Sequence, residues 1–122
     1  MGRLDPRRDL TYVADSVDGF VRAGTTPNLE GTCTQLGTGV SVSIAELFAL
    51  ACKVLGVDAA PIQDSRRMRP DASEVLVLES DPALARTRLG WSPSVSLENG
   101  IRQTAEWVRS NLHHYNLDYL HV

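Results

Sequence analysis

The chain has 122 residues, of which 43% are apolar and 22% charged, values typical of one globular domain and not of a disordered segment. Its formal charge of −3 disfavours a nucleic-acid binder, which normally carries a basic excess. No apolar run is long enough to cross a bilayer and the first residues have no apolar core, so we expect a cytosolic protein without a signal peptide.

The N-terminal quarter predicts a short extended segment followed by a helix. Residues 7–13 combine charge with a β-prone run, and Gly24 stands where a helix would end. Between them, apolar residues recur at helical spacing, at Val13, Val17, Phe20 and Val21.

A strand, a glycine turn and a second helix are predicted next. Residues 33–36 favour a short strand, which the Gly-Thr-Gly turn at 37–39 would end. Ser43 and Glu46 have the spacing of a capping box before an apolar helical face, and Gly56 would close that helix. Cys33 and Cys52 are expected to be reduced, buried residues.

The C-terminal half predicts one more strand and two helices. Residues 75–78 read as a short buried strand. The Asp-Pro pair at 81–82 predicts an N-cap and first helical residue, with the helix ending at Gly90. Ser96 can cap the last helix, and residues 113–122 are expected to form a flexible tail.

These elements make about four helices with two or three short strands, which is an α/β or α+β fold in a single domain over residues 1–122. The strands are too few to build a sheet that buries both helical layers. We therefore expect helical apolar faces to lie open when the chain is alone, and the chain to self-associate or to be marginally stable.

The motifs that would bind a cofactor or metal are missing. The turn at 37–39 lacks the third glycine of a dinucleotide fingerprint, because that position holds Val42. His113, His114 and His121 have no carboxylate or cysteine at ligand spacing. We expect no metal site, no catalytic residues and no bound cofactor in this chain.

Arginines are the main candidates for ligand binding. The candidates are Arg8, near the N-terminus, and a cluster formed by Arg66, Arg67 and Arg69. Guanidinium groups bind phosphate oxygens in bidentate geometry, so two separated sites could hold one diphosphate. Solvated surface charge is the alternative explanation.

Five segments, in order, resemble the C-terminal part of extended short-chain dehydrogenases/reductases that act on nucleotide sugars. This is the NAD-dependent epimerase/dehydratase family, here in its 4,6-dehydratase-like branch. The segments are R-D-L-T-Y-V-A-D at 8–15, L-G-T-G with S-I-A-E-L at 36–47, R-P-D-A-S-E-V at 69–75, D-P-A-L-A-R with L-G-W-S-P at 81–93, and V-S-L-E-N-G-I with E-W at 95–107.

The resemblance implies the substrate-binding portion of a Rossmann-type enzyme without its dinucleotide-binding core. In that family, bound NAD removes and returns a hydride, and the glycine fingerprint and Tyr-x-x-x-Lys pair lie in the N-terminal two thirds. This chain has a single lysine, Lys53, with no tyrosine four residues before it. The chain is therefore not expected to be catalytically competent alone, and whether it counts as an enzyme is left open. The reaction of the full-length enzyme is also left open: it is either dehydration, as in a lyase, or epimerisation, as in an isomerase.

The resemblance also implies site residues and partners. Arg8 and Arg69 correspond to family arginines that contact the diphosphate, and Asp71 to a ribose contact. The expected ligand is a nucleotide-diphosphate sugar, bound weakly, and the expected protein partner is a Rossmann domain or a second copy. Two alternatives stay open: a non-enzymatic interaction module derived from the family, and the small subunit of a split enzyme.

Overall fold

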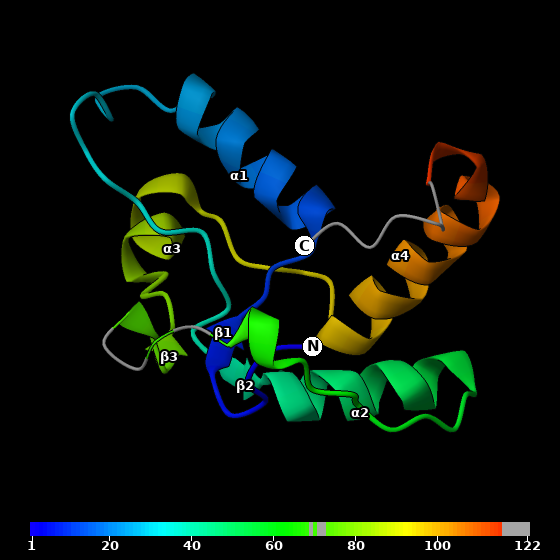
Figure 1. The fold of residues 1–122 in the computed structure, drawn as a ribbon. Coiled ribbons are helices and arrows are strands. Elements are labelled where there is room, and N and C mark those ends of the chain that lie inside the picture. The colour runs from blue at the N-terminus through cyan, green and yellow to red at the C-terminus, as the bar shows by residue number, and fades with distance from the viewer. Residues whose placement is uncertain (69, 71–72, 116–122) are drawn as a thin grey trace.

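A computed structural model describes residues 1–68, 70 and 73–115 of the chain. This part contains four α-helices, two short 3₁₀ turns and a small sheet (Figure 1). In chain order the elements are β1 (Arg7–Asp9), α1 (Val13–Thr25), β2 (Ser41–Ser43), α2 (Ile44–Leu55), η1 (Ser65–Arg67), β3 (Val77–Leu78), α3 (Ala83–Leu89), α4 (Leu97–Ser110) and η3 (Leu112–His114). The predicted fold class, with four helices and three short strands, is confirmed.

The sheet is mixed and has β1 at its centre, in the order β2-β1-β3. β2 pairs antiparallel with β1, and β3 pairs parallel with it. Arg8 therefore lies on the central strand, between Val42 of β2 and Leu78 of β3.

Local signals place α2 as predicted. The Ser43 hydroxyl accepts a hydrogen bond from the Glu46 amide at 3.1 Å, and the Glu46 carboxylate accepts one from the Ser43 amide at 2.7 Å. Both bonds satisfy donors that the first helical turn leaves unpaired. Gly56 ends the helix in the left-handed region, with φ of 66°.

The strand predictions need correction. Residues 33–36 form no strand, since their backbone makes no hydrogen bond to another backbone segment among the described residues. The strand in this part of the chain is Ser41–Ser43. β3 covers only Val77–Leu78 of the predicted 75–78 and pairs with β1, and these residues are exposed instead of buried.

Smaller differences concern helix ends and the cysteines. α1 continues past Gly24 to Thr25, and α3 begins at Ala83, with the Asp81 carboxylate accepting a hydrogen bond from the Ala83 amide at 3.0 Å. Cys33 is exposed and Cys52 is half-buried, so neither is buried as expected, and both are free thiols. No helix among the described residues is long and apolar enough to span a membrane.

The hydrophobic core is small and centres on Trp91. Trp91 and Ala85 are fully buried and Leu89 is nearly so, with Ala23, Leu29 and Leu36 packed against them. The indole Nε1 of Trp91 donates to the Asp15 carbonyl at 2.9 Å, which ties the core to α1. In contrast, the four apolar residues of α1 that were predicted from helical spacing are exposed, so the expected open helical face is present at α1.

Of the predicted tail, residues 113–115 are described and begin with the end of η3, whereas residues 116–122 lie outside the described residues.

Candidate functional site

Arg8, the first of the predicted site residues, is clamped by its own chain. Its Nη1 donates to the carbonyls of Arg7 and Val75, both at 2.8 Å. Its Nη2 donates to the Glu74 carboxylate at 3.4 Å. Only 23% of the Arg8 side chain is exposed, and 8% of that of Glu74. Arg8 is therefore held in one orientation and is not a freely solvated surface charge.

The clamp leaves part of the Arg8 guanidinium unused. An arginine carries five N–H donors in a fixed planar fork, and these contacts account for three of them. The Nε–H and one Nη2–H of Arg8 have no partner among residues 1–68, 70 and 73–115. Two donors on one planar group are what a carboxylate or phosphate accepts in bidentate geometry.

The other two predicted site residues, Arg69 and Asp71, lie outside the described residues. Their immediate neighbours can be followed, because the Ser73 amide and hydroxyl both donate to the Pro70 carbonyl, at 2.9 and 3.0 Å. Since Glu74 and Val75 contact Arg8, the structure brings the end of the Arg-Pro-x-x-Ser-Glu-Val segment against Arg8. Residues more than sixty positions apart thus meet at one place.

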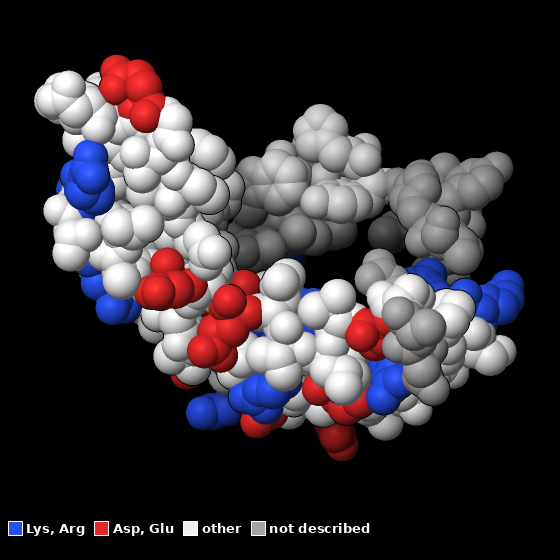
Figure 2. Space-filling view, turned by 90° about the vertical axis from the view of Figure 1, so that its left-hand side faces the viewer, with Lys and Arg blue, Asp and Glu red and all other residues white. Residues whose placement is uncertain are grey.

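The rest of the arginine cluster is less suited to bind a ligand. Arg66 donates to the Asp64 carboxylate through Nε and Nη2, at 3.1 and 2.8 Å, so its fork is already occupied. On the face drawn in Figure 2, acidic and basic side chains are interspersed. The described part of that face carries no continuous basic stripe of the kind that binds nucleic acid.

The Gly-Thr-Gly turn at 37–39 is closed to an anion. The Asp9 carboxylate accepts hydrogen bonds from the amides of Thr38 and Gly39 at 2.9–3.0 Å and from the Thr38 hydroxyl at 2.6 Å. Burial alone would raise the pKa of Asp9, but these bonds and one from the Ser80 amide outweigh it and hold the pKa below its usual value. Because an ionised carboxylate already fills the turn, the described residues do not fit the pyrophosphate of NAD there.

Asp15 plays a similar part at the start of α1. Its carboxylate accepts hydrogen bonds from the Ser94 amide and hydroxyl at 3.1 and 2.7 Å and from the Val95 amide at 3.0 Å. Burial raises the pKa of Asp15, and the bonds from Ser94 and Val95 more than offset this, so the pKa is lowered. Both aspartates belong to the family segment at 8–15, but their partners lie too far along the chain to be found by local spacing.

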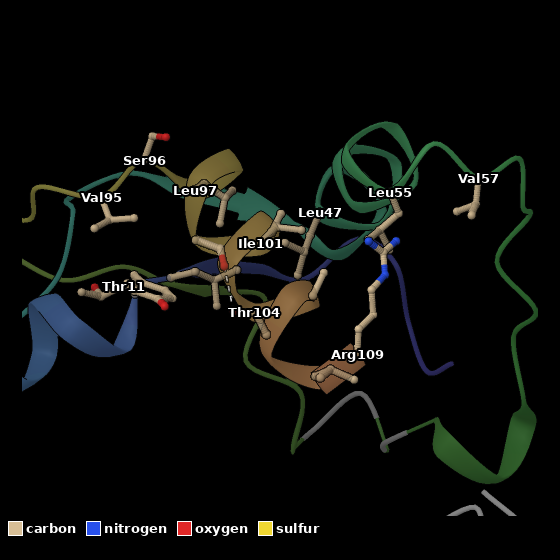
Figure 3. Close-up of a pocket in the computed structure, with 15 residues that line it drawn as sticks. Thr11, Leu47, Leu55, Val57, Val95, Ser96, Leu97, Ile101, Thr104 and Arg109 are labelled. Carbon is tan, nitrogen blue, oxygen red and sulfur yellow. Dashed lines mark hydrogen bonds between the residues drawn. The ribbon is translucent and has the colours of Figure 1, made fainter. Parts of the chain in front are cut away.

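A cavity of about 530 Å³ lies between α2 and α4. In Figure 3, Leu47 of α2 and Ile101 of α4 face each other, and Arg109 reaches toward Leu55. A second cavity of about 400 Å³ shares Leu10, Val95, Ser96 and Leu97 with the first. Neither is lined by Arg8. Mostly aliphatic walls fit an apolar group and not a diphosphate, so the cavities and the arginine site are different places.

Comparison with known proteins gives a consistent set of relatives. Residues 1–104 match the family model described as GDP-mannose 4,6 dehydratase. The chain is 37% identical over 109 residues to UDP-glucose 4-epimerase of Mycolicibacterium smegmatis, covering 84% of the chain and 31% of that protein.

Solved structures of similar fold include UDP-glucose 4-epimerase of Thermotoga maritima with UDP-glucose, with a TM-score of 0.79 and 30% identity over 92% of this chain and 34% of that one. UDP-glucuronic acid 4-epimerase of Bacillus cereus, in complex with UDP-glucuronic acid and NAD, has a TM-score of 0.76 and 26% identity, covering 91% of this chain and 34% of that one. The chain spans about a third of the length of these relatives.

Proposed function

Because the chain belongs to the GDP-mannose 4,6-dehydratase family of extended short-chain dehydrogenases/reductases, we propose that it is the nucleotide-sugar-binding, C-terminal portion of an NAD-dependent nucleotide-sugar 4,6-dehydratase or epimerase. In this proposal the chain contributes substrate binding and does not catalyse the reaction alone. We extend the proposal to a cytosolic location.

The observation that carries the proposal is the state of Arg8. Its guanidinium is fixed by Val75 and Glu74 and keeps two donors without a partner among the described residues. An arginine whose orientation is already set loses little side-chain entropy on binding an anion. Arg69 would supply the second cation and Asp71 a ribose contact, both from the segment that is joined to Arg8 through Glu74 and Val75.

The same contacts predict weak affinity. Glu74 partly neutralises Arg8, and the rest of the relatives' length, which would close the site, is not in this sequence. A charge-assisted hydrogen bond contributes about 1.5–3 kcal/mol when shielded from water, and solvent screens it here. We expect dissociation constants in the millimolar range, set by the diphosphate more than by the sugar.

The proposal assigns NAD to the full-length relatives and not to this chain. NAD, when bound in a full-length relative, accepts and returns the hydride. We derive no step through NAD in this chain, because Asp9 occupies the turn at 37–39. We expect no saturable binding of NAD or NADP at micromolar concentration, which calorimetry would measure.

A second function has its own supporting observation. The exposed apolar residues of α1 favour a chain that binds a protein partner, either as the small subunit of a split enzyme or as a non-enzymatic interaction module. A neighbouring reading frame with a glycine fingerprint and Tyr-x-x-x-Lys would favour the split enzyme. Loss of Arg8 and Arg69 in close relatives would favour the interaction module.

The test is an amide-shift NMR titration with dTDP-, UDP-, GDP- and CDP-sugars, for the wild type and four variants. We expect Arg8→Lys and Arg69→Ala each to weaken binding several-fold, and Arg69→Lys to restore it only in part, because lysine cannot form the bidentate fork. Arg86→Ala removes the same charge from an exposed position of α3 and should leave binding unchanged.

Salt provides an independent readout in the same titration. Exposed charge pairs are screened within about 10 Å at 0.1 M salt, so the affinity should fall as salt rises. Equal shifts for the wild type, Arg8→Lys and Arg69→Ala, or no shifts with any nucleotide sugar, would contradict the proposal.

A further inference from the structure

α2 and α4 pack on each other, yet they bury almost no side chain. Every residue of both helices is described, and the one that is buried is Gly100 of α4. Leu47 of α2 and Ile101 of α4, which face each other, are only half-buried (Figure 3). An apolar stripe on a helix normally has a covered face, and the described part of the chain covers these two stripes only in part.

The space left open is the larger cavity, of about 530 Å³. It extends along α4 from Leu97 to Arg109, and Tyr12 lines it from the segment before α1. Val57, which follows α2 and also lines the cavity, is 50% exposed. Cavities of roughly 300–1,000 Å³ hold small ligands, so this one has room for several aliphatic side chains.

The described chain turns back at the end of α4. The Asn111 side chain donates to the Trp107 carbonyl at 2.8 Å, and the Tyr115 amide donates to the Leu112 carbonyl at 3.0 Å. The Tyr115 ring then packs edge to face on Trp107, with ring centroids 6.5 Å apart. In a continuous helix these two residues would be about 12 Å apart along the axis. Tyr115 therefore lies beside α4 and not beyond its end.

This contact places the end of the described chain next to the cavity. Gly100, Thr104 and Trp107 are three or four positions apart and so share one stripe of α4. Gly100 and Thr104 line the cavity. Trp107 and Tyr115 stay 55% and 46% exposed in spite of their contact, so both rings can cover a further apolar segment.

Residues 116–122 continue from Tyr115 and lie outside the described residues. Their sequence is N-L-D-Y-L-H-V, which is rich in aliphatic and aromatic residues. An extended chain spans at most about 3.3–3.6 Å per residue, so this segment can reach roughly 23–25 Å. Leu97, at the far end of the cavity, lies about 15 Å back along α4 from Trp107. The segment therefore has both the length and the side chains to fill the cavity.

We propose that residues 116–122 fold back along α4 and occupy the cavity between α2 and α4, with Leu117, Leu120 and Val122 as the buried side chains. This occupancy removes apolar surface of the segment and of both helices from water. The attachment to α4 favours this segment over a separate chain, because a short tether gives an effective concentration on the order of millimolar. The inference goes beyond nucleotide-sugar binding, since Arg8 is not among the described residues that line the cavity.

The first test is methyl NMR of the 122-residue chain. We expect nuclear Overhauser contacts between methyl groups of residues 116–122 and those of Leu47 and Ile101. A sample that mixes isotopically labelled and unlabelled chains separates contacts within one chain from contacts between copies. We expect the contacts to lie within one chain and to be unchanged on dilution.

The second test compares the full chain with a chain that ends at Tyr115. The probe is the dye anilinonaphthalene sulfonate, which binds exposed apolar surface. Its binding is followed through the shift of the Ile101 methyl group, which reports the cavity and not the exposed face of α1. We expect the shorter chain to bind the dye at least about five-fold more tightly, and its α4 amides to exchange at least about five-fold faster.

Point variants keep the length of the chain and lie outside the core around Trp91. Leu120→Asp should show both effects in part, because an ionised carboxylate is costly to bury. Ile62→Asp introduces the same charge at a position that is 82% exposed and is not among the residues lining the cavity, so it should behave like the wild type. The circular dichroism of both variants should match that of the wild type.

Three results would overturn the proposal. Methyl contacts that occur only between copies would assign the cavity to a second chain. Absence of contacts from residues 116–122 would mean that they do not enter the cavity. Equal dye binding at Ile101 by the full chain and the chain that ends at Tyr115 would mean that the cavity is open in both. Loss of the nucleotide-sugar shifts with these measurements unchanged would contradict the proposed function alone.

Discussion

The surroundings of Trp91 and the outer face of α1 contrast within one small chain. Trp91 is fully buried, its indole nitrogen is paired, and Ala85 and Leu89 pack beside it. On α1, side chains of equal apolarity are more than half exposed. The difference lies in the partners available, because the described part of the chain leaves these side chains of α1 largely uncovered.

We call the surroundings of Trp91, with the segments tied to them, the closed region. The contacts that hold this region together are largely polar. The carboxylate of Asp9 connects β1 to the turn at 37–39 and to Ser80, and that of Asp15 connects α1 to Ser94 and Val95. Each carboxylate accepts several hydrogen bonds, and together they span up to 80 positions of sequence. A chain with a small apolar core can thus keep its arrangement through a few well-paired charges, while the apolar residues of α1 stay exposed.

Replacing the two tryptophans is the strongest test of this contrast. Trp91→Ala empties the centre of the core and should lower the free energy of unfolding by about 4 kcal/mol, enough to unfold much of a marginally stable chain. Trp107→Ala, at a position 55% exposed, should lower it by less than about 1 kcal/mol. Urea unfolding followed by circular dichroism measures both, and similar losses would refute the distinction.

Replacing Asp15 tests whether the hydrogen-bonded carboxylates of Asp9 and Asp15, the polar joints of the closed region, stabilise the fold. Asp15→Asn keeps the shape but removes the charge and one acceptor, so the free energy of unfolding should fall by about 2–3 kcal/mol. The pKa of Asp15 is lowered in the folded chain from an ordinary value of 3.8, so its stabilisation is present above that ordinary value and is lost as the pH falls below it through the lower pKa of the folded chain. Unfolding measured from about pH 6 to about pH 3 should show a shallower decline for Asp15→Asn than for the wild type.

The exposed Asp58→Asn removes one negative charge without touching a joint and serves as the control. If Asp15→Asn and Asp58→Asn follow the same curve, the carboxylate of Asp15 does not stabilise the closed region.

Features with local causes were predictable from the sequence. The capping box of Ser43 and Glu46 and the glycine at 56 located α2 because both ends of that helix depend on residues within one turn. The helical spacing of the α1 stripe was equally local, and the expectation that this face would lie open agrees with its exposure.

Features that depend on a distant partner were not predictable in the same way. Residues 33–36 have the composition of a strand, but a strand exists only when another pairs with it, and the described chain offers none. Likewise Arg8 was singled out as a ligand-binding residue, whereas its clamp by Glu74 and Val75 required the parallel pairing of β1 with β3. Asp9 and Asp15 were not identified as joints, since their partners lie 29 to 80 positions away.

Replacing one glycine in each region compares the closed region with α1 through the smallest expected changes in the free energy of unfolding. A Cβ at Gly37 would collide with the Ser80 side chain and lie 2.7 Å from Oδ2 of Asp9, inside the polar joint of the closed region. Gly37→Ala should therefore lower the free energy of unfolding by about 1–3 kcal/mol, since the backbone must shift to admit the methyl group.

Gly24, near the end of α1, lies in the open region, and a Cβ added there would meet no atom within 4 Å. Alanine favours the helix over glycine, so Gly24→Ala should raise the free energy of unfolding by about 0.5–1 kcal/mol. Thermal and urea unfolding of the two variants would show opposite signs for the same chemical change. If Gly24→Ala also destabilised the chain, the open face of α1 would be closer packed than its exposure indicates, and the contrast with the Trp91 region would fail.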